Sequence, residues 1–158
     1  MLADMKKRPS TEGSASPPER ATCQFCQIVD GAASAHVVFE DAVSLAFLDN
    51  RPLFPGHCLL VTKQHYATLS DIPKDVIGPL FLNAQMVAAS VQQAMDADGT
   101  FVAINNIVSQ SVPHFHIHVV PRKRGDGLRG FFWPRHKLAE EEAASVQKAI
   151  VAAVRDER

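Results

Sequence analysis

Three histidines, His114, His116 and His118, alternate with bulky apolar residues in the C-terminal half of the chain. Successive side chains of a β-strand point to opposite faces, so the three imidazoles would line one face, roughly 6.5 to 7 Å apart. The opposite face would then turn toward the core, and it carries Phe115, Ile117 and Val119. A row of imidazoles on one face is suited to phosphate or metal chemistry.

The residues alone leave three interpretations of this row open. The imidazoles could be the polar side of a half-buried sheet. They could bind a metal, because two histidines at this spacing on a strand can place nitrogens on one zinc ion, although no carboxylate follows nearby. They could supply a nucleophile, because an imidazole with an ordinary pKa of about 6.5 is mostly neutral at pH 7 and can attack phosphorus.

A second group of chemically capable residues is the pair Cys23 and Cys26, which are separated by two residues. This spacing allows two thiolates to bind one metal ion. A redox pair or two unrelated thiols would show the same spacing. The third cysteine, Cys58, falls within an apolar run and is predicted to be a small core residue.

The spacing of apolar residues predicts the strands and helices that must position these residues. Apolar spacing predicts short strands in five places, at 37–39, 43–48, 58–62, 100–105 and 114–121. Between Ser70 and Asp98 the spacing is helical instead, and Gly99 ends the helix. A last helical pattern starts near His136. Short connections between the strands favour an α+β fold with an antiparallel sheet over a parallel, doubly wound one.

Length and composition indicate one domain with flanking segments. The chain has 158 residues, 46% of them hydrophobic, which is enough for a single core. Residues 1–20 are rich in proline, serine and charge and are expected to form a disordered tail. The domain is expected at 21–135, followed by a C-terminal helix at 136–158.

Charge and cysteine content exclude several classes of partner. The 16 basic and 17 acidic residues give a net charge of −1, which argues against a surface that binds nucleic-acid polymers. We find no run of about 18 apolar residues and no secretory pattern, so no membrane partner is expected. Three cysteines are too few for a disulfide scaffold, and we predict a cytoplasmic protein.

Four segments together resemble the histidine triad superfamily of nucleotide hydrolases and transferases. The segment from His114 to Val120 looks like its defining motif, in which three histidines alternate with apolar residues. The other three resemble its nucleoside-binding strand and turn, the residues that precede the triad, and its closing aromatic segment: Phe47–His57, Gln110–Val112 and Phe132–Pro134. The resemblance implies an antiparallel five-stranded sheet with one long helix and a C-terminal helix.

The resemblance also implies roles for individual residues. His116 matches the nucleophile that attacks the α-phosphorus, and His118 matches the residue that contacts the phosphate and the leaving group. The remaining matches are phosphate-contacting or substrate-binding positions: Gln110, Ser111, Asp49, Asn105 or Asn106, and Trp133. Both asparagines are candidates because the loop before the triad lacks the family's glycines and is about two residues shorter. Asp49 would accept ribose hydroxyls, although it could instead form a turn with Asn50.

A zinc-containing branch of the superfamily uses a cysteine pair and two histidines as ligands. Matching positions here are Cys23, Cys26, His65 and His114, which implies a structural zinc and makes His114 a metal ligand. The other histidines, His36, His57 and His136, are expected to have structural or surface roles. The family's usual assembly implies a homodimer.

These matches imply a hydrolase or transferase acting on purine nucleoside phosphoramidates or dinucleoside polyphosphates. Catalysis would pass through a covalent nucleotidyl-histidine on His116, with no organic cofactor. Two alternatives differ in class: a metallohydrolase with a catalytic zinc on the triad, and a nucleotide-binding, zinc-stabilised protein with little or no catalysis.

Overall fold

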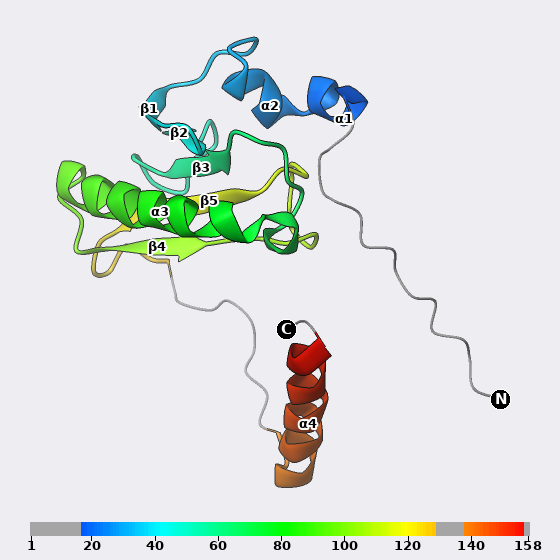
Figure 1. Cartoon of the computed structure of the whole chain (residues 1–158). Coiled ribbons are helices and arrows are strands. Elements are labelled where there is room, and N and C mark those ends of the chain that lie inside the picture. The colour runs from blue at the N-terminus through cyan, green and yellow to red at the C-terminus, as the bar shows by residue number, and fades with distance from the viewer. Residues whose placement is uncertain (1–16, 129–137, 157–158) are drawn as a thin grey trace. The chain divides into compact units, whose positions relative to one another are not determined.

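The computed structural model describes residues 17–128 and 138–156, which belong to two units, residues 1–126 and 127–158 (Figure 1). Within these described ranges, the first unit contains a five-stranded sheet with helices on both faces, and the second contains one helix. The expected tail at 1–20 lies mostly outside the described residues. Its last part is helical, because α1 (Pro17–Thr22) begins inside that range.

The sheet has the strand order β1-β2-β3-β5-β4, and every neighbouring pair is antiparallel. Its strands are β1 (Val37–Glu40), β2 (Ser44–Leu48), β3 (Cys58–Thr62), β4 (Gly99–Ala103) and β5 (His116–Arg122). This confirms the expected α+β fold with an antiparallel five-stranded sheet. One strand boundary differs from the prediction in a way that affects the histidines. The last strand, β5, begins at His116, so it carries two histidines and not the three that the sequence predicted. His114 lies in the bend before it.

The long helix α3 (Lys74–Ala94) packs on one face of the sheet (Figure 1). Its buried residues recur at helical spacing: Leu80, Ala84, Val87 and Val91. They belong to one hydrophobic cluster with Leu60, Phe115 and Ile117. The helix starts later than Ser70 because residues 69–71 form a 3-10 turn, η1 (Leu69–Asp71). The Asp71 carboxylate accepts from the Thr68 backbone N–H at 2.8 Å, which closes a capping box at that turn.

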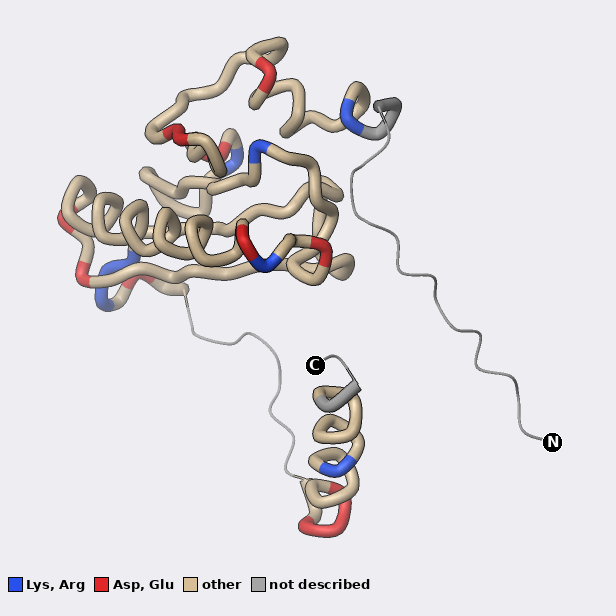
Figure 2. Tube along the Cα trace, viewed as in Figure 1, with Lys and Arg blue, Asp and Glu red and all other residues tan. Residues whose placement is uncertain are grey.

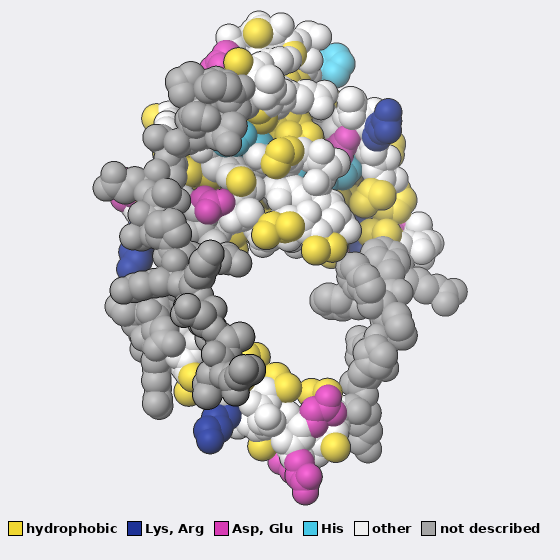
Figure 3. Space-filling view, turned by 90° about the vertical axis from the view of Figure 1, so that its right-hand side faces the viewer, with side chains coloured by type: hydrophobic (Ala, Val, Ile, Leu, Met, Phe, Trp, Pro, Cys, Tyr) yellow, Lys and Arg dark blue, Asp and Glu magenta, His cyan; other side chains and the backbone are white. Residues whose placement is uncertain are grey.

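The opposite face of the sheet carries a second buried cluster. There α2 (Gln24–Val29) brings Phe25 and Cys26 against Phe47, Leu59 and Val61. In the sheet register Phe47 pairs with Leu59, which pairs with His118, and Val61 pairs with His116. Residues paired across antiparallel strands share a face, so both histidines of β5 lie on the α2 side. Figure 3 shows histidine side chains among the hydrophobic ones at the surface of this unit.

The second unit contains α4 (Glu140–Asp156), near the range where the sequence predicts a C-terminal helix. Three glutamates occupy its first turn, where the helix dipole favours negative charge (Figure 2). Its apolar side chains, including Val146, Ile150 and Val154, are exposed within this unit. Among the described residues, no helix combines the length and apolarity needed to cross a bilayer.

Candidate active site and metal centre

His116 stands at the first position of β5 and is 3% exposed. Its Nδ1 lies 2.7 Å from the carbonyl oxygen of His114. A carbonyl only accepts hydrogen bonds, so Nδ1 carries the proton and Nε2 keeps its lone pair. The edge of the Phe25 ring packs against the imidazole, with centroids 5.2 Å apart and planes at 83°. The local structure therefore holds His116 in the tautomer that a nucleophile requires.

His118 is held by His57, for which the sequence predicts a structural or surface role. The Leu53 backbone N–H donates to His57 Nδ1 at 3.2 Å, so the His57 proton is on Nε2. His57 Nε2 in turn lies 3.0 Å from His118 Nδ1 and donates to it. His118 must then carry its own proton on Nε2. These three residues form a directed chain of hydrogen bonds, which we call the relay.

The relay histidines are neutral near pH 7. Burial, with smaller contributions from His116 and His57, lowers the pKa of His118 to about 4. Burial also lowers the pKa of His57, and the Asp49 carboxylate opposes this shift. A neutral His118 with its proton on Nε2 is a hydrogen-bond donor on one side and an acceptor on the other.

A tight turn places His57 immediately before β3. The His57 N–H donates to the Phe54 carbonyl at 3.0 Å across Pro55 and Gly56, and Gly56 has φ +90°. Proline followed by a residue of positive φ is typical of a type II turn, in which glycine is favoured at the second position. A Cβ on Gly56 would also lie 2.5 Å from Met95 Cγ. The Pro55-Gly56 pair is a turn signal that the sequence shows, but it only orients His57 and does not reveal which side chain His57 contacts.

A cleft of about 760 Å³ opens above both histidines of β5. Apolar side chains of Phe25, Ile28, Phe47 and Leu59 line it together with the polar residues Asp49, Asn50, Arg51, Ser111, His36, His116 and His118. Ligand pockets commonly have volumes of about 300 to 1,000 Å³, so the cleft can accommodate a mononucleotide. The structure thus brings Asp49, Ser111, His116 and His118 to one cleft.

Asp49 forms a turn and also lines the cleft. Its Oδ1 accepts from the Arg51 N–H at 2.8 Å, which forms the turn, while Oδ2 lies 3.6 Å from His57 Nδ1. The carboxylate is part of the cleft wall. A carboxylate oxygen has two acceptor sites, so Oδ2 can accept further hydrogen bonds.

The loop before the triad holds the remaining described candidates away from the cleft lining. Gln110 donates from Nε2 to the Ala67 carbonyl at 2.6 Å and accepts the Ile107 N–H at 2.8 Å. Asn106 Oδ1 accepts the Leu69 N–H at 2.9 Å. Neither these two side chains nor Asn105 is among the cleft-lining residues of the described chain. Trp133 lies outside the described residues.

Two residues of this loop that carry a Cβ adopt a strained backbone conformation. Ile107 has φ +66° and Ser109 has φ +61°, values that are uncommon for residues with a Cβ. The Asn106 carbonyl accepts the Val108 N–H at 2.7 Å around Ile107, a tight three-residue turn. The side-chain bonds of Asn106 and Gln110 therefore stabilise a strained backbone.

Four candidate metal ligands, one of which is His114, lie close together. The ligand atoms of Cys23, Cys26, His65 and His114 all lie within 4.8 Å of one another. His114 Nδ1 is 3.4 Å from each sulfur, and His65 Nδ1 is 3.2 Å from the Cys26 sulfur. Tetrahedral zinc places sulfur and nitrogen ligands about 3.5 Å apart. The spacing and chemistry of this set, the metal cluster, fit a zinc ion.

Hydrogen bonding prepares His114 for this role. Its Nε2 lies 2.7 Å from the Thr62 carbonyl, so the proton is on Nε2 and the lone pair of Nδ1 faces the sulfurs. Burial, together with the neighbouring Cys23, raises the pKa of the Cys26 thiol to about 12. A thiolate at this buried position therefore requires a compensating cation, and metal binding would release protons.

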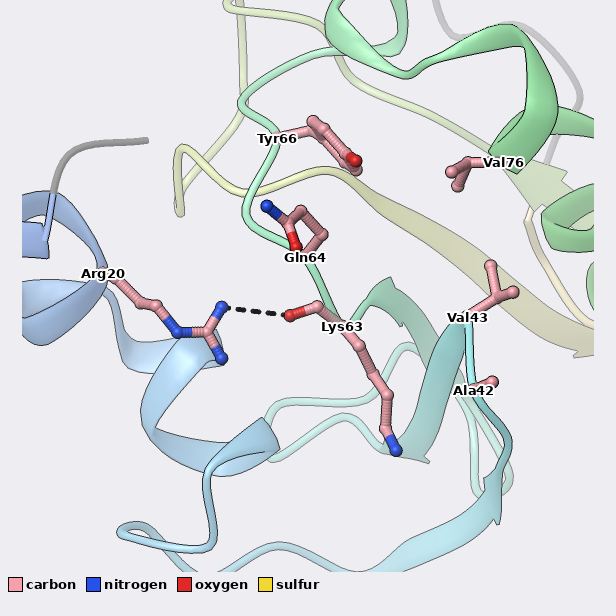
Figure 4. A pocket seen from close by; sticks show the side chains of 7 residues that line it. All are labelled: Arg20, Ala42, Val43, Lys63, Gln64, Tyr66 and Val76. Atoms are coloured by element: carbon pink, nitrogen blue, oxygen red, sulfur yellow. Dashed lines mark hydrogen bonds between the residues drawn. The ribbon is translucent and has the colours of Figure 1, made fainter. Parts of the chain in front are cut away.

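A second cavity, of about 470 Å³, opens beside Arg20, Lys63 and Tyr66 (Figure 4). Arg20 donates from Nη1 to the Lys63 carbonyl at 3.1 Å and pairs with Asp30, which ties α1 to the end of β3 and to the end of α2. Lys63 pairs with Glu40 at 2.6 Å. Because both cations of this cavity are already paired, its lining explains the anchoring of α1 and α2, and we assign no ligand to it.

Comparisons with known proteins point to one family. The model of the HIT domain family matches residues 30–125. An uncharacterised HIT-like protein of Saccharolobus solfataricus is 34% identical over 85% of this chain and 99% of its own length. The adenosine 5′-monophosphoramidase of Saccharomyces cerevisiae is 32% identical over 84% of this chain and 82% of its own. The crystal structure of a Zn-bound histidine triad family protein from Mycobacterium smegmatis superimposes with a TM-score of 0.66 and 34% identity, covering 88% and 99% of the two chains.

Proposed function

The chain belongs to the HIT domain family, and from this premise we propose that it cleaves a bond at the α-phosphorus of purine nucleoside phosphoramidates or dinucleoside polyphosphates. The name of the yeast relative, an adenosine 5′-monophosphoramidase, supports the first of these substrate classes. The observation that carries the proposal is the pair of opposite tautomers on β5. His116 offers a lone pair at Nε2, and His118 offers a proton at Nε2, in one cleft.

The proposed reaction has two steps. His116 Nε2 forms a bond to the α-phosphorus while the bond from phosphorus to the leaving nitrogen or oxygen breaks. His118 donates its Nε2 proton to the leaving atom, and the relay through His57 keeps that proton on Nε2. Water then attacks the phosphorus while the bond from phosphorus to His116 Nε2 breaks, and a proton of that water returns to His118 Nε2. The nucleoside monophosphate is released and both histidines are regenerated. Another acceptor in place of water would make the protein a transferase.

The cleft supplies contacts for the rest of the nucleotide. The apolar walls formed by Phe47, Leu59 and Ile28 suit a flat base, and the free acceptor sites of Asp49 suit ribose hydroxyls. Ser111 lines the cleft near the triad and is proposed to contact phosphate oxygens. Gln110, Asn105 and Asn106 are proposed to act through the shape of the loop, because the first and last bond to backbone groups.

The metal cluster is proposed to hold a structural zinc, and the Zn-bound relative from M. smegmatis supports this proposal. Cys23, Cys26, His65 and His114 would be its ligands. A bound zinc ion would supply folding energy and would keep both thiols ionised. No step of the proposed reaction passes through it.

A homodimer is proposed on the outer faces of α3 and β4. The stretch between Asp75 and Asp96 carries no charged residue (Figure 2). It exposes Phe81, Leu82 and Met86, and the edge strand β4 exposes Phe101 and Val102. Exposed apolar side chains beside an open sheet edge are typical of an interface. Three unbridged cysteines suit a reducing compartment, and the proposed location is the cytoplasm.

The test is intact-mass analysis after mixing the protein with adenosine phosphoramidate or a diadenosine polyphosphate, with turnover measured in parallel. We expect a transient adduct of one adenylyl group in wild type, and neither adduct nor turnover in His116→Ala. Calorimetric binding of AMP by His116→Ala would show that the variant still folds. Undiminished turnover in His116→Ala would refute the proposal, and AMP binding by wild type without turnover would favour the non-catalytic alternative.

A further inference from the structure

The short helix α2 takes part in both the metal cluster and the cleft. Cys26 is fully buried and points its sulfur toward His65 and His114. Its neighbour Phe25 lines the cleft, and so does Ile28 one turn later. Six residues are too few for a helix to be stable alone, so α2 depends on its contacts with the rest of the unit.

Phe25 lies between the two sites and touches both. Its ring centroid is 5.2 Å from that of His116 and 5.9 Å from that of His114, with interplanar angles of 83° and 69°. It also packs edge-on against Phe47, another residue of the cleft wall, at 5.6 Å. Because Phe25 lies between Cys23 and Cys26, ligation of the two cysteines restricts its backbone from both sides.

His114 provides a second connection, through one residue. Its Nδ1 faces the sulfurs of the metal cluster, and its carbonyl oxygen accepts the Nδ1 proton of His116. A metal that fixes the His114 side chain would therefore also fix the carbonyl that sets the tautomer of the nucleophile.

We propose that the metal cluster and the nucleotide cleft are energetically coupled through Phe25 and His114, so that a bound metal strengthens nucleotide binding and a bound nucleotide retains the metal. This inference rests on the proposed function, which places a nucleotide in the cleft. Coupling between two sites is reciprocal, so it can be measured from either side. Phe25 is then a positioning residue for His116.

The experiment uses the full chain loaded with one zinc ion. Zinc release into an excess of a chromogenic chelator is followed with and without saturating AMP. Couplings between sites are typically about 5- to 150-fold in affinity, and affinity differences are expressed mostly in the dissociation rate, so we expect AMP to slow zinc release at least about fivefold. The same comparison in Phe25→Leu, at its own saturating AMP concentration, should show a slowing of less than about twofold.

A matched control is Phe39→Leu, which makes the same change in the core on the α3 side of the sheet. This variant should keep the full effect of AMP on zinc release. Zinc content of one per chain in both variants would show that neither change destroys the cluster.

The outcomes separate this inference from the proposed function. If AMP binds in calorimetry but leaves zinc release in wild type unchanged, the coupling is refuted and the proposed function stands. If AMP slows release equally in wild type and Phe25→Leu, Phe25 is not the link. If neither AMP nor any other nucleotide binds the zinc-loaded protein, the proposed function fails and the coupling fails with it.

Discussion

Two clusters of potential metal ligands flank His116, and they differ in whether the lone pairs of their histidine nitrogens are free or occupied by hydrogen bonds. One is the metal cluster, and the other consists of Asp49, His57 and His118. In both, the candidate ligand atoms lie within 4.8 Å of one another. Proximity alone therefore does not distinguish a metal centre from a hydrogen-bond network.

Proton placement does distinguish them. In the metal cluster His114 Nε2 donates its proton to the Thr62 carbonyl, so the Nδ1 lone pair is free and faces the sulfurs. In the second cluster the Leu53 N–H occupies the Nδ1 lone pair of His57, and His57 Nε2 is protonated toward His118. The His57 nitrogens are thus both committed to hydrogen bonds. This comparison argues against a catalytic zinc on the triad. It does so even though the fold brings the Asp49 carboxylate close to His118, whereas no carboxylate lies near the triad in the sequence.

The largest expected effect comes from breaking the metal cluster. Cys26→Ser replaces a thiolate ligand at a fully buried position, and we expect zinc content to fall from about one per chain to nearly zero. The thermal midpoint should fall as well, because metal binding and folding are linked. Metal content is measured by atomic emission after dialysis.

Cys58→Ser is the matched control, since Cys58 is equally a buried cysteine but packs in the core on the α3 side. It should keep one zinc per chain. Equal zinc in Cys26→Ser, or loss of turnover in strict proportion to zinc with His116 never modified, would contradict the distinction drawn between the clusters.

The next effect tests the relay. His57→Leu removes the donor to His118, so the His118 proton is no longer held on Nε2. Loss of one buried hydrogen bond is worth about 1–3 kcal/mol, so we expect kcat to fall about 10- to 100-fold with KM and zinc content nearly unchanged. Steady-state kinetics with adenosine phosphoramidate provide the measurement.

His57→Gln separates the relay from simple packing, because its side-chain amide can donate near the former Nε2. This variant should retain most of the activity. If the leucine and glutamine variants lost equal activity, the hydrogen bond would not be what matters, and His57 would be a packing residue.

The two clusters also differ in how much of each could be predicted from the sequence. The spacing of the cysteine pair and of the triad marked Cys23, Cys26 and His114 in the sequence, whereas His65 was named only through the resemblance to the zinc-containing branch. The structure brings these four side chains together. The helix was predictable from the helical spacing of Leu80, Ala84 and Val87, and the strands were predictable as short apolar runs separated by turn residues.

The relay was not predictable, because its bonds depend on three-dimensional placement. Nothing near His57 in the sequence marks it as a partner of His118, and only the register of β3 with β5 brings the two side chains together. The same holds for Gln110, whose spacing before the triad suggests phosphate contact. Its amide donates to the Ala67 carbonyl in this structure, and the sequence does not reveal the position of that backbone group.

A smaller effect is expected from pH. The pKa of His118 is about 4 in the folded protein, mainly because of burial, and about 6.5 in an unfolded chain. Between these values the unfolded chain binds more protons, so stability falls as pH falls. From pH 7 to pH 5.5 this group should contribute a loss of about 1 kcal/mol.

Urea unfolding of wild type and His118→Phe at both pH values, with saturating zinc, measures this contribution. His114, whose pKa burial also lowers to about 4, is common to both proteins and cancels in the difference. The wild type should lose about 1 kcal/mol more than the variant over this range. An equal loss in both would mean that His118 does not stay neutral in the folded relay.

The smallest expected effect concerns the carboxylate of the second cluster. Asp49→Asn keeps an oxygen for the Arg51 N–H, so the turn should persist, but it replaces Oδ2 with a group that cannot accept a ribose hydroxyl. Loss of a partly exposed hydrogen bond should raise KM about three- to fivefold, with zinc content unchanged.

A deoxyribose substrate shows whether this change acts on the sugar. Wild type should discriminate against the 2′-deoxy analogue of adenosine phosphoramidate, and Asp49→Asn should discriminate much less, because the missing hydroxyl and the missing acceptor form one contact. If the variant discriminated as strongly as wild type, Asp49 would not bind the ribose. If the variant instead lost zinc, Asp49 would be a metal ligand, and the second cluster would be a metal centre like the first.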